Sequence, residues 1–152
     1  MKLTPGQVRE ILSLSEDRFR HWKKALPPLA GRNGYKPCFS HGDLLAMALI
    51  KAMTDDAGVQ VGALHAVAAN LFDLCGRQSW AGLERSVLVL ELPGVRAEFV
   101  PEPHVPEPER IGIIVPCRQI IADLRERMLQ DAKENEQGHL RFTPTMVRGG
   151  AA

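Results

Sequence analysis

The amino-acid sequence predicts a mainly helical protein: an N-terminal helical module, then a small α+β segment with short strands and a final amphipathic helix. Three observations support this. Apolar residues recur at helical spacing through most of the first 75 residues. Short β-prone runs bounded by proline and glycine follow, and a helical stripe returns after Pro116. We therefore divide the chain into segments 1–75, 76–137 and a mobile tail, 138–152, which has no periodicity.

Composition and motif content exclude several classes of protein. The 152 residues, 45% of them apolar, suit one or two small domains with a packed core. The apolar runs are shorter than the roughly 20 residues of a membrane span, and no signal-peptide core stands near Met1, so we expect a cytoplasmic protein with no membrane partner. Three widely spaced cysteines predict neither disulfides nor a metal site. Without a phosphate loop or a catalytic motif, we expect no enzyme activity and no cofactor.

Charge is distributed unevenly along the chain. Residues 1–54 carry nine basic and four acidic residues, a net charge of +5, whereas the remainder has a net charge of −4. Six basic residues and no acidic one fall between Arg18 and Lys36. Such a dense basic stretch suits a polyanion such as DNA, and the alternative is a solvated face of an ordinary domain.

Two short helices are predicted at the start of the chain. Thr4 is placed to cap a helix over Pro5–Leu12, because proline follows it at the first helical position. Ser15 is placed to cap a second helix, which ends at Pro27-Pro28 and carries an apolar stripe. Only residues 13–15 connect the two. This spacing is typical of a helix-turn-helix. The stripe consists of Phe19, Trp22 and Leu26.

The next segment predicts a wing and two more helices. Asn33-Gly34 is a strong hairpin signal inside the basic stretch, so we expect a β wing there. Ser40, with Asp43 three residues later, predicts a capping box and a third helix that ends in a turn at Asp55–Gly58. A fourth helix is expected over Val61–Leu74. Together these elements make a winged helix-turn-helix of four helices plus a wing.

The C-terminal half predicts three strands and a helix. The strands are expected over Ser86–Leu92, Arg96–Val100 and Ile111–Val115, with an extended Pro/Glu connector before the last of them. The final helix is expected from Pro116 to about Glu134. Its apolar face is either the core of a small α+β domain or a dimer seam. We favour dimerisation, because these elements are too few to bury a core alone. The face consists of Ile120, Ile121, Leu124 and Met128.

Residues 3–74 resemble the DNA-binding domain of the MerR family of transcription regulators. The family's pieces, in order, are a serine-led helix with an apolar-Arg-aromatic-aromatic run, where His21 here replaces the usual tyrosine, a Leu-Pro break, a Gly-Tyr-Arg wing and a Ser-x-x-Asp-Leu helix start. In this chain they read Phe19-Arg20-His21-Trp22, Leu26-Pro27, Gly34-Tyr35-Lys36 and Ser40-His41-Gly42-Asp43-Leu44. The chain departs from the family after Leu74, where a long dimerisation helix normally follows.

The resemblance implies a homodimer that binds promoter double-stranded DNA and controls transcription. It carries over to Arg20, His21 and Trp22 on the recognition helix and to Tyr35 and Lys36 in the wing. RNA polymerase and a small-molecule effector are the further partners that it raises, and the sequence identifies neither. Architectural DNA bending, as by an excisionase-like protein, and a protein-interaction adaptor are the competing functions.

The positions of the polar residues suggest individual roles in DNA binding. Arg18 and His21 lie off the apolar stripe and are expected to reach base edges in the major groove. Trp22 belongs either to the core or to a contact with the DNA backbone. The basic residues outside the base-reading pair suit phosphates. The full candidate set is Ser15, Arg18, Arg20, His21, Trp22, Lys23, Lys24, Arg32, Asn33, Tyr35 and Lys36.

Overall fold

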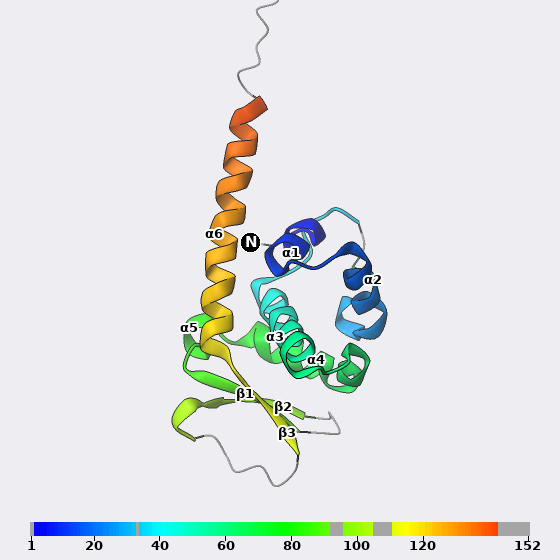
Figure 1. Ribbon diagram of the computed structural model, residues 1–152, viewed down its shortest axis with the longest axis vertical. Helices are drawn as coiled ribbons and strands as arrows, with labels where there is room; N and C mark the ends of the chain where they lie inside the picture. Colours follow the sequence, from blue (N-terminus) through cyan, green and yellow to red (C-terminus); the bar gives the residue numbers. More distant parts are fainter. Residues whose placement is uncertain (1, 33, 92–95, 105–110, 143–152) are drawn as a thin grey trace, which may run out of the picture.

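The structure, a computed structural model, describes residues 2–32, 34–91, 96–104 and 111–142. The fold is mainly helical, with a small three-stranded antiparallel sheet and a long C-terminal helix, as the sequence predicts in outline. Figure 1 shows the N-terminal helices on one side, the sheet at one end, and α6 running along the other side and extending past the rest of the molecule. In the described part of the chain, no helix combines the length and apolarity needed to cross a membrane.

The first two helices are confirmed. α1 (Pro5–Leu12) begins with a capping box at Thr4, and α2 (Glu16–Ala25) begins at Ser15, whose Oγ accepts a hydrogen bond from the Arg18 backbone N–H at 3.1 Å. The connection turns at Ser13, which has a φ of 53°. A 3₁₀ turn, η1 (Pro27–Leu29), follows α2, because the proline pair cannot continue the helix.

The predicted β wing is not seen as a pair of strands. No strand is assigned to the described residues between α2 and α3, and Asn33 lies outside those residues. The segment instead returns to the N-terminus, where Leu3 and Phe39 form an isolated antiparallel bridge. The Leu3 N–H donates to the Phe39 carbonyl at 2.7 Å, and the Phe39 N–H donates back at 3.1 Å.

The third helix, α3 (His41–Ala57), is the centre of the molecule. Ser40 and Asp43 form the predicted capping box. The prediction of a turn over Asp55–Gly58 is wrong for its first three residues, which are helical, and the helix ends only at Gly58, with a φ of 68°. Buried residues face every direction around this helix; they are Gly42, Leu44, Leu45, Ala46, Met47, Ala48, Leu49, Ile50 and Met53.

The segment after α3 differs from the single helix expected over Val61–Leu74. A 3₁₀ turn, η2 (Val61–Leu64), leads into α4 (His65–Arg77), which packs on α3. A short helix, α5 (Trp80–Leu83), was not predicted. Ser79 caps it, its Oγ accepting from the Gly82 N–H at 3.2 Å.

The three predicted strands are confirmed to within two residues. β1 (Ser86–Glu91) lies in the middle, with β2 (Arg96–Pro101) and β3 (Gly112–Pro116) antiparallel on either side. β1 is buried on both faces, which explains its unbroken apolar sequence. The connector contains a 3₁₀ turn, η3 (Glu102–His104), before residues 105–110, which lie outside the described part.

The apolar face of the final helix, α6 (Cys117–Phe142), was predicted to form a dimer seam, and it is instead buried within the chain. The helix begins after Pro116, which ends β3, and continues past the expected end at Glu134; tail residues 143–152 lie outside the described part. Ile121 and Leu124 are 0% and 3% exposed within the single chain, and Ile120 and Met128 pack half-buried beside them. This face is therefore occupied by α1, α3 and the sheet of the same chain.

The main hydrophobic core crosses the predicted boundary after residue 75, and a small second cluster of Val87, Val89 and Val100 lies in the sheet. One cluster of buried residues runs from Leu3 in the N-terminal segment to Leu124 in α6. The C-terminal half does not bury a core alone, as expected, but the missing partner surface comes from α1, α3 and α4 of its own chain.

Substitutions on α6 test this assignment. We expect Leu124→Ala to lower the free energy of unfolding by about 2–5 kcal/mol, because it empties a buried site. Leu129→Ala, at a position 64% exposed, serves as the control and should change stability by under about 0.5 kcal/mol. Urea denaturation measures both. Equal losses would mean that α6 does not pack as described.

The start of α3 permits a second test. A Cβ at Gly42 would lie 2.7 Å from Gly76 Cα and 2.8 Å from the Cys75 carbonyl oxygen, so α3 and α4 approach too closely for any side chain there. We expect Gly42→Ala to cost about 1–3 kcal/mol of stability. Gly62→Ala, where nothing lies within 4 Å, should leave the thermal midpoint unchanged or higher. A neutral Gly42→Ala would contradict the close approach.

Candidate nucleic-acid interface

Arg18, expected to read bases, is instead bound to α3. Its Nη2 donates to Asp55 Oδ1 at 2.5 Å and to Thr54 Oγ1 at 2.8 Å, and its guanidinium lies 5.3 Å from the centre of the Trp22 ring. Asp55 is shared with Lys51, whose Nζ lies 2.8 Å from Oδ2. These contacts fasten the first turn of α2 to the last turn of α3. Arg18 is therefore bound within the protein, where it joins two helices, and does not present a free guanidinium as expected of a base reader.

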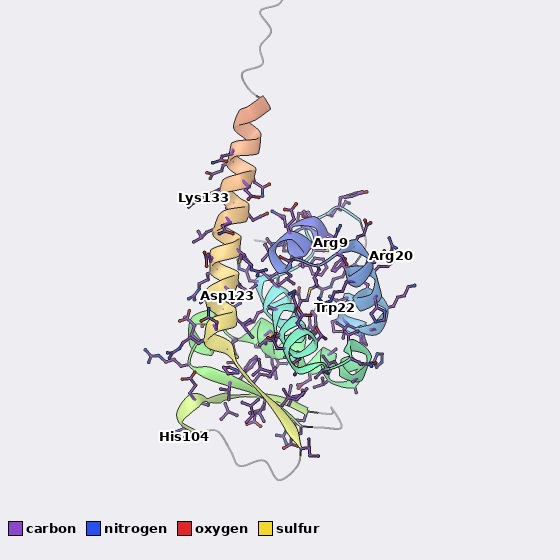
Figure 2. The ribbon with its side chains drawn as sticks, viewed as in Figure 1. Arg9, Arg20, Trp22, His104, Asp123 and Lys133 are labelled. Atoms are coloured by element: carbon purple, nitrogen blue, oxygen red, sulfur yellow. The ribbon has the colours of Figure 1, made fainter. Side chains whose placement is uncertain are left out.

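Trp22 and Arg32 also face inward. Trp22 is 1% exposed and lies between α2 and α3, so its alternative role as a contact to the DNA backbone is wrong (Figure 2). The Arg32 Nη1 forms an ion pair with Asp43 Oδ2 at 2.6 Å, and its guanidinium lies 5.2 Å from the Phe39 ring. Arg32 thus ties the loop after η1 to the N-cap of α3, which removes it from the phosphate-binding set.

The remaining exposed candidates lie on the outer face of α2 and in the loop that follows it. Arg20, His21 and Lys24 are exposed on α2, and Tyr35 and Lys36 are exposed in the loop. Tyr35 is 97% exposed, although a side chain as large as that of tyrosine is usually at least partly buried. Figure 2 shows Arg20 on the side of α2 away from α6.

Arg20 is held by two carboxylates at the start of its own helix. Its Nη1 lies 3.2 Å from Asp17 Oδ1, and its Nη2 lies 3.7 Å from Glu16 Oε1. All three side chains are more than half exposed, so the pairs contribute little stability and can exchange for other partners. Their effect is to hold the guanidinium near the N-terminus of α2.

Of the three other candidates, two make contacts within the protein and one lies outside the described residues. Ser15 uses its Oγ to cap α2. The half-buried Lys23 lies with its Nζ 5.2 Å from the centre of the Phe19 ring. Asn33 lies outside the described residues.

A residue from the far end of the sequence completes the support of this face. Arg127 on α6 donates from Nη1 to the Ile11 carbonyl oxygen and to Ser13 Oγ, both at 3.1 Å. It therefore braces the connection between α1 and α2. The sequence does not predict this role of Arg127, because a contact across more than 110 residues leaves no local pattern. At the other end of α2, His65 Nδ1 lies 3.0 Å from the Ala25 carbonyl oxygen.

Cys75 and Cys117 are buried free thiols within the core. Burial raises the pKa of Cys117 to about 11, and burial raises the pKa of Cys75 further still. Both remain protonated at neutral pH, whereas metal ligation and nucleophilic attack require the thiolate. Within the residues that the structure describes, no three His, Cys, Asp or Glu side chains come together in a way that could hold a metal ion.

No protein-family model matches this sequence, and a search of curated proteins finds no match.

The Arg18–Asp55 contact predicts a pH-dependent stability. Hydrogen bonds from Arg18 and Lys51 lower the pKa of Asp55 below its ordinary value. A carboxyl whose pKa is lowered by folding stabilises the folded state above its unfolded pKa, and this contribution is lost as the pH falls through the folded pKa. We expect Asp55→Asn to reduce stability at pH 7, by about 1 kcal/mol because the pair is partly exposed, and to have a smaller effect below about pH 4.

Urea denaturation at pH 7 and pH 3 measures this difference. Asp73→Asn, which breaks only the exposed pair with Arg77 within α4, is the matched control and should have little effect at either pH. An equal loss from Asp55→Asn at both pH values would show that the Asp55 charge contributes nothing.

Proposed function

We propose that this protein is a transcription regulator that binds specific double-stranded DNA sites through a MerR-like winged helix-turn-helix, with α2 in the major groove. The observation that carries the proposal is the exposed basic face of α2, Arg20, His21 and Lys24, on a helix held rigidly from behind. A reading helix must present long donors while its own position is fixed. Arg18, Trp22 and Arg127 supply that fixation.

The structure supports a revised division of roles. Arg20 and His21 lie at the middle of α2, with Arg20 in its N-terminal half, the part of a recognition helix that reaches base edges. Lys24 and Lys36 suit phosphates, and Tyr35, exposed beside Lys36, suits the sugar-phosphate backbone. The loop containing Tyr35 and Lys36 takes the place of the wing.

The acidic start of α2 favours insertion into a groove over lateral contact with the backbone. Glu16 and Asp17 are exposed in the first turn, where they would repel phosphates. In the major groove a carboxylate instead accepts a hydrogen bond from the cytosine amino group, and an arginine beside it pairs with guanine. The Asp17–Arg20 pair is thus suited to read a base step.

We further propose that the regulator is a cytoplasmic homodimer, since two copies read an inverted repeat. The dimer surface is not the buried face of Ile121 and Leu124. Large apolar side chains that remain exposed include Ile111, Ile114 and Leu129, at 81%, 44% and 64%.

Selection of duplex fragments from a genomic pool, followed by fluorescence anisotropy over a range of salt concentrations, tests the proposal. We expect Lys36→Ala to weaken binding to all duplexes and to lower the log-log salt slope by roughly one. Arg20→Ala should cost about 1–3 kcal/mol on the selected site and relax its sequence preference. Lys133→Ala on α6, which removes the same charge far from α2, is the control and should leave affinity unchanged.

The other results separate the competing functions. Salt-sensitive binding and bending without enrichment of a site would replace the regulator by an architectural DNA-binding protein. No binding at low salt would leave the adaptor function. Wild-type affinity in both Arg20→Ala and Lys36→Ala would refute the assigned face.

A further inference from the structure

A hollow of about 370 Å³ opens between the last turn of α3, the first turns of α6 and strand β3. Its walls are mainly apolar and come from three elements, with Ala52, Ile113 and Ile120 as examples. A second hollow, of about 170 Å³, adjoins it along the groove between α3 and α6, and Ala52, Asp56, Ile120 and Asp123 line both. A volume above roughly 300 Å³ with apolar walls is that of a small-molecule site.

The charged residues that line the larger hollow are both acidic. Asp56 comes from α3 and Asp123 from α6, so the two carboxylates enter from different walls. Among the described residues Asp56 forms no ion pair, and Asp123 accepts one hydrogen bond, from Gln119 Nε2 at 2.7 Å. Neither carboxylate is therefore held in a direct ion pair within the described part of the chain.

The nearby cations are engaged elsewhere. Of these two hollows, Lys51 and Arg127 line the smaller and not the larger. Lys51 is paired with Asp55, and Arg127 donates to the connection between α1 and α2. The larger hollow thus combines an apolar surface with two carboxylates and no lining cation, whereas the smaller hollow also carries Lys51 and Arg127.

We propose that this groove binds a small organic cation with an apolar body. The ring or alkyl part would cover Ala52, Ile113 and Ile120, and the ammonium group would lie between Asp56 and Asp123. Burial of the apolar part supplies most of the affinity, and the two carboxylates select the charge. An anion of the same shape is repelled, and a neutral analogue leaves both carboxylates without a partner. The proposal does not depend on DNA binding.

NMR titration of the full chain with three ligands of matched shape tests the site. The probes are 2-phenylethylammonium, neutral 2-phenylethanol and anionic 3-phenylpropionate. We expect saturable shifts of the methyl groups of Ala52, Ile113 and Ile120 with the cation, weaker shifts with the alcohol, by about tenfold in affinity, and none with the anion.

A charge-matched pair of variants completes the design. Asp56→Asn/Asp123→Asn should abolish the preference for the cation over the alcohol while leaving the alcohol's affinity unchanged. Glu91→Gln/Glu98→Gln removes the same two charges from exposed positions on β1 and β2 and should behave as the wild type. Equal affinity for cation and alcohol in the wild type, no saturable shifts at these methyls, or equal weakening in both double variants would overturn the proposal.

Discussion

The rest of the structure depends on the burial of α3 on all sides. A helix with apolar residues in every direction requires neighbours in every direction. Helices α1, α4 and α6 supply them, and α4 and α6 in turn connect α3 to the sheet. Because the main core joins both halves of the chain, the apolar face of α6 is covered without a second copy. Gly42 shows how closely this packing is fitted, since α4 occupies the space of a side chain.

Arginines at the edge of this core hold the N-terminal helices in position. Arg18 joins α2 to the end of α3, Arg32 joins the following loop to its start, and Arg127 joins α6 to the connection between α1 and α2. Two of the three belong to the basic stretch that suggests a polyanion surface in the sequence. The exposed surface that we propose binds DNA is smaller than the stretch, and it lies on the outer face of α2 and on the loop with Tyr35 and Lys36.

The last turn of α3 connects the proposed DNA interface with the proposed ligand groove. Asp55 bonds to Arg18 beneath α2, and its neighbour Asp56 lines the groove beside α6. Asp55 also lines the smaller hollow of that groove, so the last turn of α3 contributes to both surfaces. The two carboxylates also differ in state: Asp55 is fully paired, whereas Asp56 has its charge available to a ligand.

The local sequence determined where most helices and strands lie, and tertiary packing decided which of their side chains are buried, paired or exposed. Caps at Thr4, Ser15 and Ser40, the proline pair after α2 and the β-prone runs placed helices and strands correctly, because these signals act within a few residues. The extra turn of α3 through Ala57 could not be predicted, because Asp55 there is held by Arg18, distant in sequence.

The candidate site divides in the same way. The exposed positions of Arg20, His21 and Lys24 follow from helical periodicity alone. The burial of Trp22, the pairing of Arg18 and Arg32, the enclosure of Ile121 and Leu124 and the groove of Asp56 and Asp123 do not. These depend on which surfaces of distant segments meet, and that is decided by the shared core.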